Sequence, residues 1–146
     1  LVSEEKHYDK NVWVHRNGTS RAYGPSRMSD HPTFKDTGEP AFIPTSMSTE
    51  AYLCVGQDGN DSSFYSCNHG AGKSAKTSET VVPESTSALH EKLATRGVKL
   101  YNGRSSKVIE QDSSPYKRAE DVIERVVANT VVKPGDNPQP ISVIMH

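Results

Sequence analysis

The shortness of its apolar segments most restricts how this chain can fold. In the first half of the sequence each apolar run spans only a few residues, and Gly, Pro, Ser and Thr separate one run from the next. Hydrophobic residues make up only 33% of the 146 residues. Such a pattern suits short strands around a small core, so we expect either one loop-rich domain or a piece of something larger.

Apolar segments in the front half predict short strands at 11–14, 41–43, 51–56 and 63–67. The turn-favouring sequence DGND lies between the last two segments, so a β-hairpin is predicted over 51–67. Residues 21–40 show no periodicity, and we expect them to form a long loop.

The back half has helical periodicity. A helix is predicted over 85–97, with Gly97 in the position after its C-terminal cap, and a second over 116–130, whose charged face we expect to be solvated. Short strands are predicted at 98–101, 107–110, 131–133 and 141–145. The fold class is therefore α+β, with a β-rich, loop-rich front half and two amphipathic helices in the back half.

Charge and hydropathy exclude some kinds of partner. Lys and Arg together number 17 against 18 Asp and Glu, so the chain has no general field that attracts nucleic acid, and any polyanion site has to be local. No apolar run is long enough for a transmembrane helix, and we expect no membrane partner. Cys54 and Cys67 match no C-x-x-C motif. Two buried reduced thiols would favour a cytoplasmic location, and a disulfide is the alternative.

The stretch CNHGAGKS at 67–74 is the main candidate for phosphate chemistry. Its end fits a P-loop, G-x-x-x-x-G-K-[ST], but Cys67 stands where the first glycine belongs. Small residues at 70–72 let backbone N–H groups approach an anion, and Lys73 adds positive charge. His69 indicates a different role, because a neutral imidazole can attack phosphorus and form a covalent intermediate. A histidine at an ordinary glycine-rich hairpin end is the alternative.

Two other polar stretches can serve a metal or a phosphate. His15 stands at a predicted strand end, where a neutral imidazole can bind Mn, Fe or Zn, and Arg16 and Arg21 can fork onto phosphate oxygens. The turn that contains Ser46, Ser48 and Thr49 offers hydroxyls and amides that can hold a nucleotide. In both cases the alternative is an ordinary surface turn, with solvated arginines in the first.

Three blocks of the sequence, in this order, resemble the RtcB family of RNA ligases. They are HRNGTSRAYGP at 15–25, GEPAFIPTSMSTEAYLCVG at 38–56 and SCNHGAGKS at 66–74, and the back half is more loosely similar. The resemblance implies that residues 1–146 are the C-terminal portion of an RtcB-like catalytic domain. It also implies an RNA ligase that joins 3′-phosphate or 2′,3′-cyclic phosphate ends to 5′-hydroxyl ends, in RNA splicing or repair, with GTP and Mn²⁺.

The resemblance assigns roles to single residues. His69 matches the histidine that attacks the α-phosphorus of GTP and becomes guanylated, and His15 matches a manganese ligand. The predicted positions for binding the guanylate are Arg16, Pro44, Thr45, Ser46, Met47, Gly70, Ala71, Gly72 and Lys73.

The chain also departs from the family pattern. Lys73 replaces the usual arginine and loses its bidentate fork, Ala51 replaces a serine, and Met145 replaces the lysine that engages guanine. The family's other metal ligands lie upstream of the block that begins at His15. We therefore expect the chain to need the missing N-terminal part or a complementary chain, and not to ligate RNA alone. A degenerate, non-catalytic fragment that binds nucleotide or RNA is the alternative, and a P-loop NTPase is the third.

Overall fold

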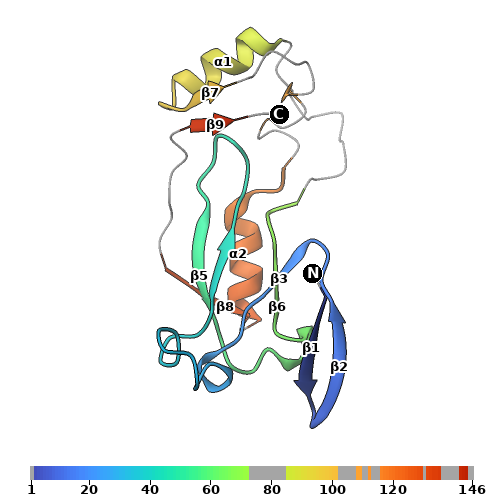
Figure 1. Cartoon of the computed structure of the whole chain (residues 1–146). Coiled ribbons are helices and arrows are strands. Elements are labelled where there is room, and N and C mark those ends of the chain that lie inside the picture. Colours follow the sequence, from blue (N-terminus) through green and yellow to red (C-terminus); the bar gives the residue numbers. More distant parts are fainter. Residues whose placement is uncertain are drawn as a thin grey trace.

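The computed structural model describes residues 2–72, 85–101, 108–109, 112, 116–129, 131–135 and 142–144. The elements in these ranges follow one long axis, with the β1–β2 hairpin at one end, α1, β7 and β9 at the other, and α2 between them (Figure 1). The strands are β1 (Val2–His7), β2 (Lys10–His15), β3 (Thr19–Arg21), β4 (Pro40–Ile43), β5 (Tyr52–Gly56), β6 (Ser66–Asn68), β7 (Lys99–Tyr101), β8 (Val132–Pro134) and β9 (Ser142–Ile144). The helices are α1 (Thr86–Ala94) and α2 (Ala119–Ala128), with 3₁₀ turns η1 (Pro25–Arg27) and η2 (Asp61–Ser63).

The strands of the described residues pair in four small groups. β1 and β2 form an antiparallel hairpin whose two turn residues, Tyr8 and Asp9, both have positive φ, as a type I′ turn requires. β3 pairs antiparallel with β6, although 44 residues separate the end of one from the start of the other. β4, β5 and β8 form an antiparallel sheet with β5 in the middle, and β7 pairs parallel with β9.

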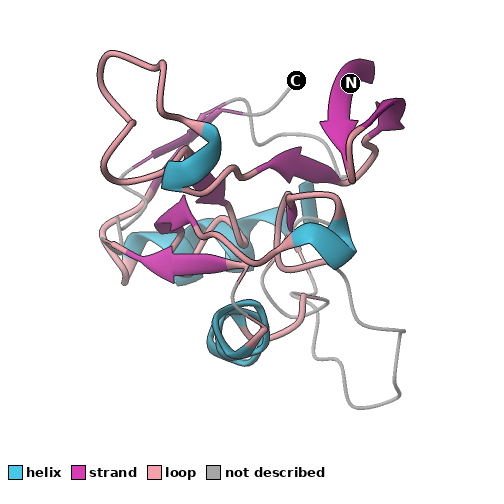
Figure 2. Ribbon diagram, turned by 90° about the horizontal axis from the view of Figure 1, so that it is seen from below, coloured by secondary structure: helices cyan, strands magenta, loops and turns pink. Residues whose placement is uncertain are grey.

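The main core lies between α2 and one face of the β4–β5–β8 sheet. Figure 2 looks along α2 and shows this helix to one side of the strands. Alternation along β4 and β5 turns every second side chain toward α2, whose buried stripe contributes Ala119 and Ile123. The buried cluster comprises Ala22, Ala41, Ile43, Tyr52, Cys54, Cys67, Ala119, Ile123, Val131 and Val132.

A second, smaller core lies under α1. Leu89 and Leu93 are fully buried there and pack with Met47, Val98 and Val108. The Ser85 hydroxyl caps the start of α1 by accepting from the Ala88 N–H at 3.2 Å. At its other end Gly97 has φ of +74°, and Val98 N–H donates to the Leu93 carbonyl at 3.0 Å, which confirms the predicted glycine position after the C-terminal cap.

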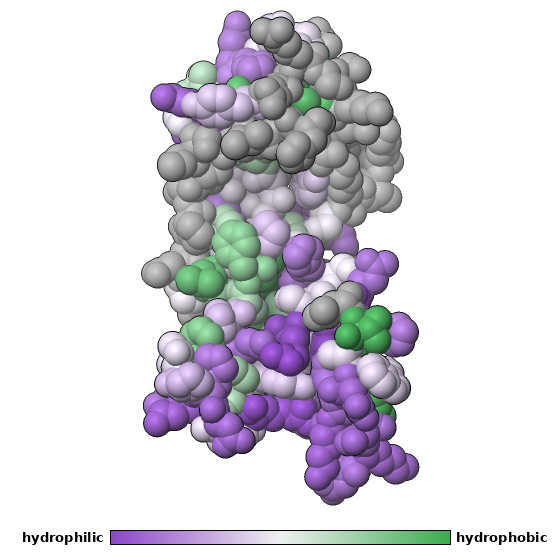
Figure 3. Space-filling model, viewed as in Figure 1, coloured by the Kyte–Doolittle hydropathy of each residue, from purple (hydrophilic) through white to green (hydrophobic). Residues whose placement is uncertain are grey.

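The outer face of the β4–β5–β8 sheet carries apolar side chains. Phe42 and Leu53 are cross-strand partners, and both are exposed. Figure 3 shows hydrophobic residues gathered at the level of β5, whereas the β1–β2 hairpin is mainly hydrophilic. Among the described residues, no helix is both long and apolar enough to cross a membrane.

The α+β class and both predicted helices are confirmed, as are the strands expected at 11–14, 41–43, 51–56, 98–101, 131–133 and 141–145. The hairpin predicted over 51–67 is wrong, because β5 pairs with β4 and β8 while β6 pairs with β3. Phe64 and Tyr65, which lie between β5 and β6, both have positive φ, and the chain changes direction there. The strand predicted at 107–110 is also wrong, because Val108 and Ile109, its described part, form a 3₁₀ turn.

The thiol prediction is confirmed. Cys54 and Cys67 are free and buried in the main core. Burial raises the pKa of Cys67 to about 12, so this thiol stays protonated at neutral pH. Cys67 is therefore a core residue and not a competing nucleophile beside His69.

The two faces of β4 differ enough for a direct test. Ile43 is 1% exposed and Phe42 is 50% exposed. We expect Ile43→Ala to lower the free energy of unfolding by about 2–5 kcal/mol, because it leaves a cavity in the main core. Phe42→Ala is the matched control and should cost less than about 1 kcal/mol. Urea unfolding measures both, and equal losses would contradict the assignment of the faces.

Candidate functional site

A hydrogen bond places the predicted nucleophile beside the turn that follows β2. β6 pairs with β3 so that Asn68 lies opposite Thr19, and His69 N–H then donates to the Gly18 carbonyl at 3.0 Å. Gly18 has φ of +70°, a conformation that few other residues adopt. Gly18 is three positions after His15, so their Cα atoms lie at most about 11 Å apart. His15 and His69, both exposed, therefore belong to the same end of the β3–β6 pair.

The block at 38–56 joins the same place. Ala71 N–H donates to the Pro44 carbonyl at 3.2 Å, and a Cβ on Gly70 would lie only 3.3 Å from that oxygen. Lys117 N–H donates to the Gly72 carbonyl at 3.0 Å. The segment 69–72 is therefore held by the turn at Gly18, the turn at Pro44 and the start of α2. The three blocks that the sequence marks for phosphate chemistry converge on this segment.

Hydroxyl groups hold the turn after Pro44 in shape. The Thr49 hydroxyl lies 2.8 Å from that of Thr45 and 2.7 Å from that of Ser46, and it accepts from the Ser46 N–H at 3.2 Å. The Thr45 hydroxyl also donates to the Glu50 carbonyl at 2.6 Å. These contacts fix the backbone of the turn from within.

The next two residues connect this turn to α1. Met47 is buried in the smaller core, and Arg96 donates to the Ser48 carbonyl at 2.7 Å. Ser48 is only 5% exposed, and its buried hydroxyl has no hydrogen-bond partner among the described residues. A buried hydroxyl without a partner is costly, so it favours a ligand that supplies the missing hydrogen bond. This fits a nucleotide at the turn.

Arg16 is buried and forms a bidentate ion pair with Glu5. Its Nη2 donates to Glu5 Oε2 at 2.9 Å, and its Nη1 donates to Oε1. The guanidinium also donates to the Ser66 hydroxyl at 3.0 Å and to the Phe64 carbonyl at 2.8 Å, and His7 lies against the same carboxylate. The alternative of a solvated arginine is therefore wrong, while the guanylate contact expected of Arg16 stays a prediction.

Arg21 uses its fork in a similar way. Its Nη2 and Nε donate to the two oxygens of Glu39 at 2.8 Å and 3.0 Å, and Tyr23 N–H donates to the same carboxylate. This ion pair joins the two ends of the loop predicted at 21–40. In both arginines of the HRNGTSR block, the guanidinium group is therefore already paired with a glutamate and is not open to bidentate binding of a phosphate.

The pKa of Glu5 reflects the buried ion pair. Burial on its own would raise this pKa, but hydrogen bonds from Arg16, Ser3 and His7 outweigh burial and hold it well below the ordinary value of 4.5. A lowered folded-state pKa means that Glu5 contributes stability above the unfolded-state value, and that this contribution is lost as the pH falls.

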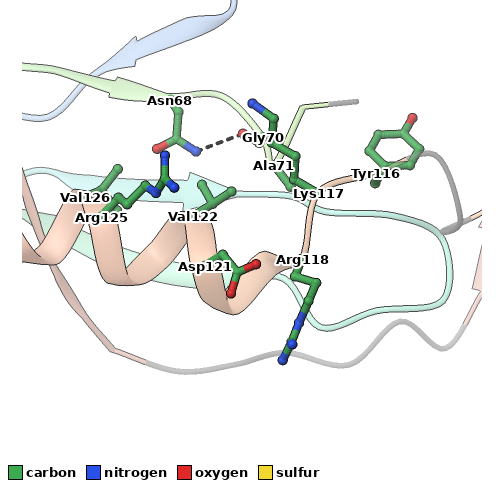
Figure 4. A pocket seen from close by; sticks show the side chains of 10 residues that line it. All are labelled: Asn68, Gly70, Ala71, Tyr116, Lys117, Arg118, Asp121, Val122, Arg125 and Val126. Carbon is green, nitrogen blue, oxygen red and sulfur yellow. Dashed lines mark hydrogen bonds between the residues drawn. The ribbon is translucent and has the colours of Figure 1, made fainter. Parts of the chain in front are cut away.

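A cavity of about 630 Å³ lies between α2 and the segment that carries Asn68 (Figure 4). Its lining includes Asn68 and Gly70, the neighbours of His69, but not His69 itself. Among the described residues, the lining is Asn68, Gly70, Ala71, Tyr116, Lys117, Arg118, Asp121, Val122, Arg125 and Val126. The sequence analysis did not predict this cavity, because it treated the charged face of the helix at 116–130 only as a solvated surface.

The P-loop hypothesis does not match the geometry. A P-loop follows a strand of a parallel sheet, but β6 pairs antiparallel with β3. Lys73 and Met145 lie outside the described residues.

The residues present do not make a manganese centre on their own. Within the part of the chain that the structure describes, no three His, Cys, Asp or Glu side chains come together as metal ligands. His15 is exposed at the end of β2 and can supply one imidazole. Mn²⁺ prefers several oxygen or nitrogen ligands, so His15 would need ligands from elsewhere.

The comparison with known proteins identifies the family. The family model described as tRNA-splicing ligase RtcB matches residues 1–146. The chain belongs to the RtcB family. It is 28% identical over 144 residues to the tRNA-splicing ligase RtcB of Pyrobaculum aerophilum, which covers 98% of this chain and 30% of that protein. It is 30% identical over 115 residues to the RNA-splicing ligase RtcB of Mycobacterium tuberculosis, covering 79% of this chain and 26% of that protein.

A further relative is the tRNA-splicing ligase RtcB of Pyrococcus horikoshii. The two chains are 29% identical over 133 residues, covering 90% of this chain and 15% of the relative. The chain thus spans less than a third of the length of these curated RtcB proteins.

The buried ion pair gives a prediction with a defined pH dependence. At pH 7 we expect Glu5→Gln to lower the free energy of unfolding by about 3 kcal/mol or more, because Arg16 then stays buried without its counter-charge. Below about pH 4.5 the difference in free energy of unfolding between wild type and variant should narrow by up to about 1.4 kcal/mol per pH unit. The reason is that Glu5 takes up a proton in the unfolded state but stays ionised in the folded state.

Glu4→Gln is the control, because Glu4 is the exposed neighbour of Glu5 on β1. Chemical unfolding at several pH values measures both variants. If the difference in free energy of unfolding between wild type and Glu5→Gln is the same at pH 7 and pH 3, the assigned direction of the Glu5 pKa is contradicted.

Proposed function

We propose that this chain is the guanylate-attachment part of an RtcB RNA ligase. The complete enzyme would use GTP and Mn²⁺ to join RNA 3′-phosphate or 2′,3′-cyclic phosphate ends to 5′-hydroxyl ends in the cytoplasm. Family membership supports the reaction class, and the relatives are named as RNA-splicing or tRNA-splicing ligases. The observation that carries the proposal is the convergence of Gly18, Pro44 and the segment 69–72 through backbone hydrogen bonds.

His69 is the proposed nucleophile. An imidazole nitrogen forms a bond to the α-phosphorus of GTP, the bond from that phosphorus to the bridging oxygen breaks, and pyrophosphate leaves with the electron pair. The guanylate then passes to the RNA 3′-phosphate, and the 5′-hydroxyl displaces GMP. The exposure of His69 leaves its ring accessible to a nucleotide.

Backbone amides next to His69 suit the phosphoryl oxygens. Among the described residues, His69 and Ala71 donate their N–H groups to the carbonyls of Gly18 and Pro44, whereas the N–H groups of Gly70 and Gly72 donate to no backbone carbonyl. Amides fixed by their neighbours stabilise developing negative charge without reorganising. The turn from Pro44 to Met47 would contact the guanylate from the other side, with the Ser48 hydroxyl as a further hydrogen-bonding group.

The metal requires ligands beyond those described. We propose that His15 supplies one ligand to Mn²⁺ and that the rest come from a further RtcB-family polypeptide segment. The exposed cross-strand pair Phe42 and Leu53 supports such a partner, because the outer face of a solvated sheet is normally polar. Completion by a partner also agrees with the share of the relatives' length that the chain spans.

A second candidate is a non-catalytic fragment that binds nucleotide or RNA. The observation that favours it is the Arg16 guanidinium, whose fork is occupied by Glu5 where the family resemblance places a guanylate contact. This candidate predicts binding of GTP or RNA without a phosphorus–nitrogen bond.

Covalent labelling separates the two candidates. Incubation with α-labelled GTP and Mn²⁺ is done with and without the complementary RtcB segment. With the segment present, the wild-type chain should take an acid-labile label. We expect His69→Ala to abolish this label, because the attacking nitrogen is gone.

His90→Ala is the matched control, since His90 is an exposed histidine on α1, away from the convergent blocks. It should leave labelling unchanged. A label that survives His69→Ala, or that never forms although GTP binds, would reject the proposed nucleophile.

A further inference from the structure

We propose that Arg16 is a positioning residue, which fixes the end of β2 at His15 to the strand that leads to His69. Arg16 follows His15 directly, and its Nε donates to the hydroxyl of Ser66, three positions before His69. The inference rests on the proposed function in one respect, which is that His15 and His69 act in the same site. It gives Arg16 a role that differs from the guanylate contact expected from the family resemblance.

The Arg16 guanidinium joins two separate parts of the fold. Toward β1, Nη1 donates to Glu5 Oε1 and to the Ser3 hydroxyl at 3.3 Å, and Nη2 donates to Glu5 Oε2 at 2.9 Å. Toward β6, Nη2 donates to the Phe64 carbonyl at 2.8 Å and Nε to the Ser66 hydroxyl at 3.0 Å. These five hydrogen bonds equal the number of N–H donors that a guanidinium has. The group is therefore fully used in holding the two parts together.

The β1–β2 hairpin is attached to the rest of the described structure through side chains. It forms a two-stranded sheet of its own at one end of the molecule (Figure 1), and among the described residues no backbone hydrogen bond joins residues 2–15 to another strand. Arg27 reaches the Lys6 carbonyl, but Lys6 lies near the hairpin turn, at the other end of the strands from His15. The attachment nearest to His15 is that of Arg16.

A backbone contact ties the other side of the turn after β2. His69 N–H donates to the Gly18 carbonyl at 3.0 Å, and Gly18 follows Arg16 by two positions. A single hydrogen bond to a glycine turn would leave the direction of β2 free to change. The bond from Arg16 to Ser66 adds a second point of attachment between the same two segments. Together the two points fix the orientation of His15 relative to His69.

The burial of the ion pair argues for positioning rather than for stability alone. Arg16 is 4% exposed and Glu5 is 5% exposed. Apolar side chains of similar size often stabilise a core as well as a buried ion pair does, whereas a bidentate pair allows only one relative orientation. The Glu5 carboxylate also accepts from the Ser3 hydroxyl at 2.5 Å and lies 3.1 Å from His7 Nε2. Arg16 is therefore held in a fixed direction on the β1 side as well.

A fixed orientation matters for a reaction that needs two imidazoles in one geometry. In the proposed function His69 attacks phosphorus, while His15 supplies one metal ligand beside the same phosphate groups. A misplacement of reacting groups by about 1 Å can lower a rate by about 100-fold. Loss of the Arg16 bridge would therefore slow the transfer of guanylate to His69, although no group that contacts GTP is removed.

A spin label on the hairpin tests the bridge without any catalysis. Glu4 is exposed on β1, while Cys54 and Cys67 are buried, so a nitroxide reagent should react only at position 4 of a Glu4→Cys chain. Paramagnetic broadening of the amide signals of 66–69 then reports how β6 lies relative to the hairpin. We expect Ser66→Ala and Arg16→Lys to lose part of this broadening, because the hairpin then samples orientations farther from β6.

Labelling kinetics test whether the bridge serves the reaction. With α-labelled GTP, Mn²⁺ and the complementary RtcB segment present, Arg16→Lys and Ser66→Ala should each lower the saturating rate of labelling about tenfold or more. Their dissociation constants for GTP should stay within about twofold of wild type, because the bridge acts on geometry and not on ground-state binding.

Ser62→Ala is the matched control. Ser62 is an exposed serine of η2 that does not contact Arg16, so this variant should equal wild type in amide broadening, labelling rate and GTP affinity. Circular dichroism checks that all variants are folded.

The outcomes separate the possible roles of Arg16. Weaker GTP binding by Arg16→Lys but not by Ser66→Ala would make Arg16 a guanylate contact and overturn the proposal. Wild-type broadening and wild-type labelling rates in both variants would also overturn it, even if both variants unfold more easily. If the wild-type chain takes no label, the ligase proposal fails, and loss of broadening in both variants still upholds the bridge between the two segments.

Discussion

The antiparallel pairing of β3 with β6 is the constraint on which the rest of the site depends. It joins residues that are distant in sequence, and the hydrogen bond from His69 to Gly18 extends the pairing by one step. Without it, the histidine segment would have no fixed relation to the turn after β2. The bond from Ala71 to Pro44 then adds the block at 38–56. The turn at Gly18, the turn at Pro44 and the segment 69–72 thus form one surface, although each of them alone would be an ordinary surface turn.

Ion pairs inside the front half change which cations can meet a phosphate. Arg16 and Arg21 are the arginines that the sequence offers for this purpose, yet glutamates from β1 and from the end of the 21–40 loop occupy their guanidinium groups. Their charges serve the fold, because the Glu5 pair ties β1 and β2 to the segment before β6. Among the described residues, Lys117 just before α2 and Arg125 on α2 make no ion pair.

Sequence could predict those elements whose signal is local. α2 and α1 follow from helical spacing, and Gly97 follows from its place after the last apolar residue of α1. β1 was missed because its sequence, VSEEKH, buries the polar Glu5 and His7 and shows no apolar alternation. β3 was missed, and the 51–67 hairpin was wrong, because the pairing of β3 with β6 depends on tertiary contacts. The cavity required the same contacts, since its two walls come from β6 and α2.

Amide chemical shifts during a GTP titration of the ¹⁵N-labelled chain test most directly whether the three blocks form one site. The account predicts that the amides of Gly18, Ser46 and Gly70 shift together and fit one dissociation constant, while exposed amides of the β1–β2 turn stay fixed. Shifts confined to one of the three turns, or three unrelated dissociation constants, would contradict it.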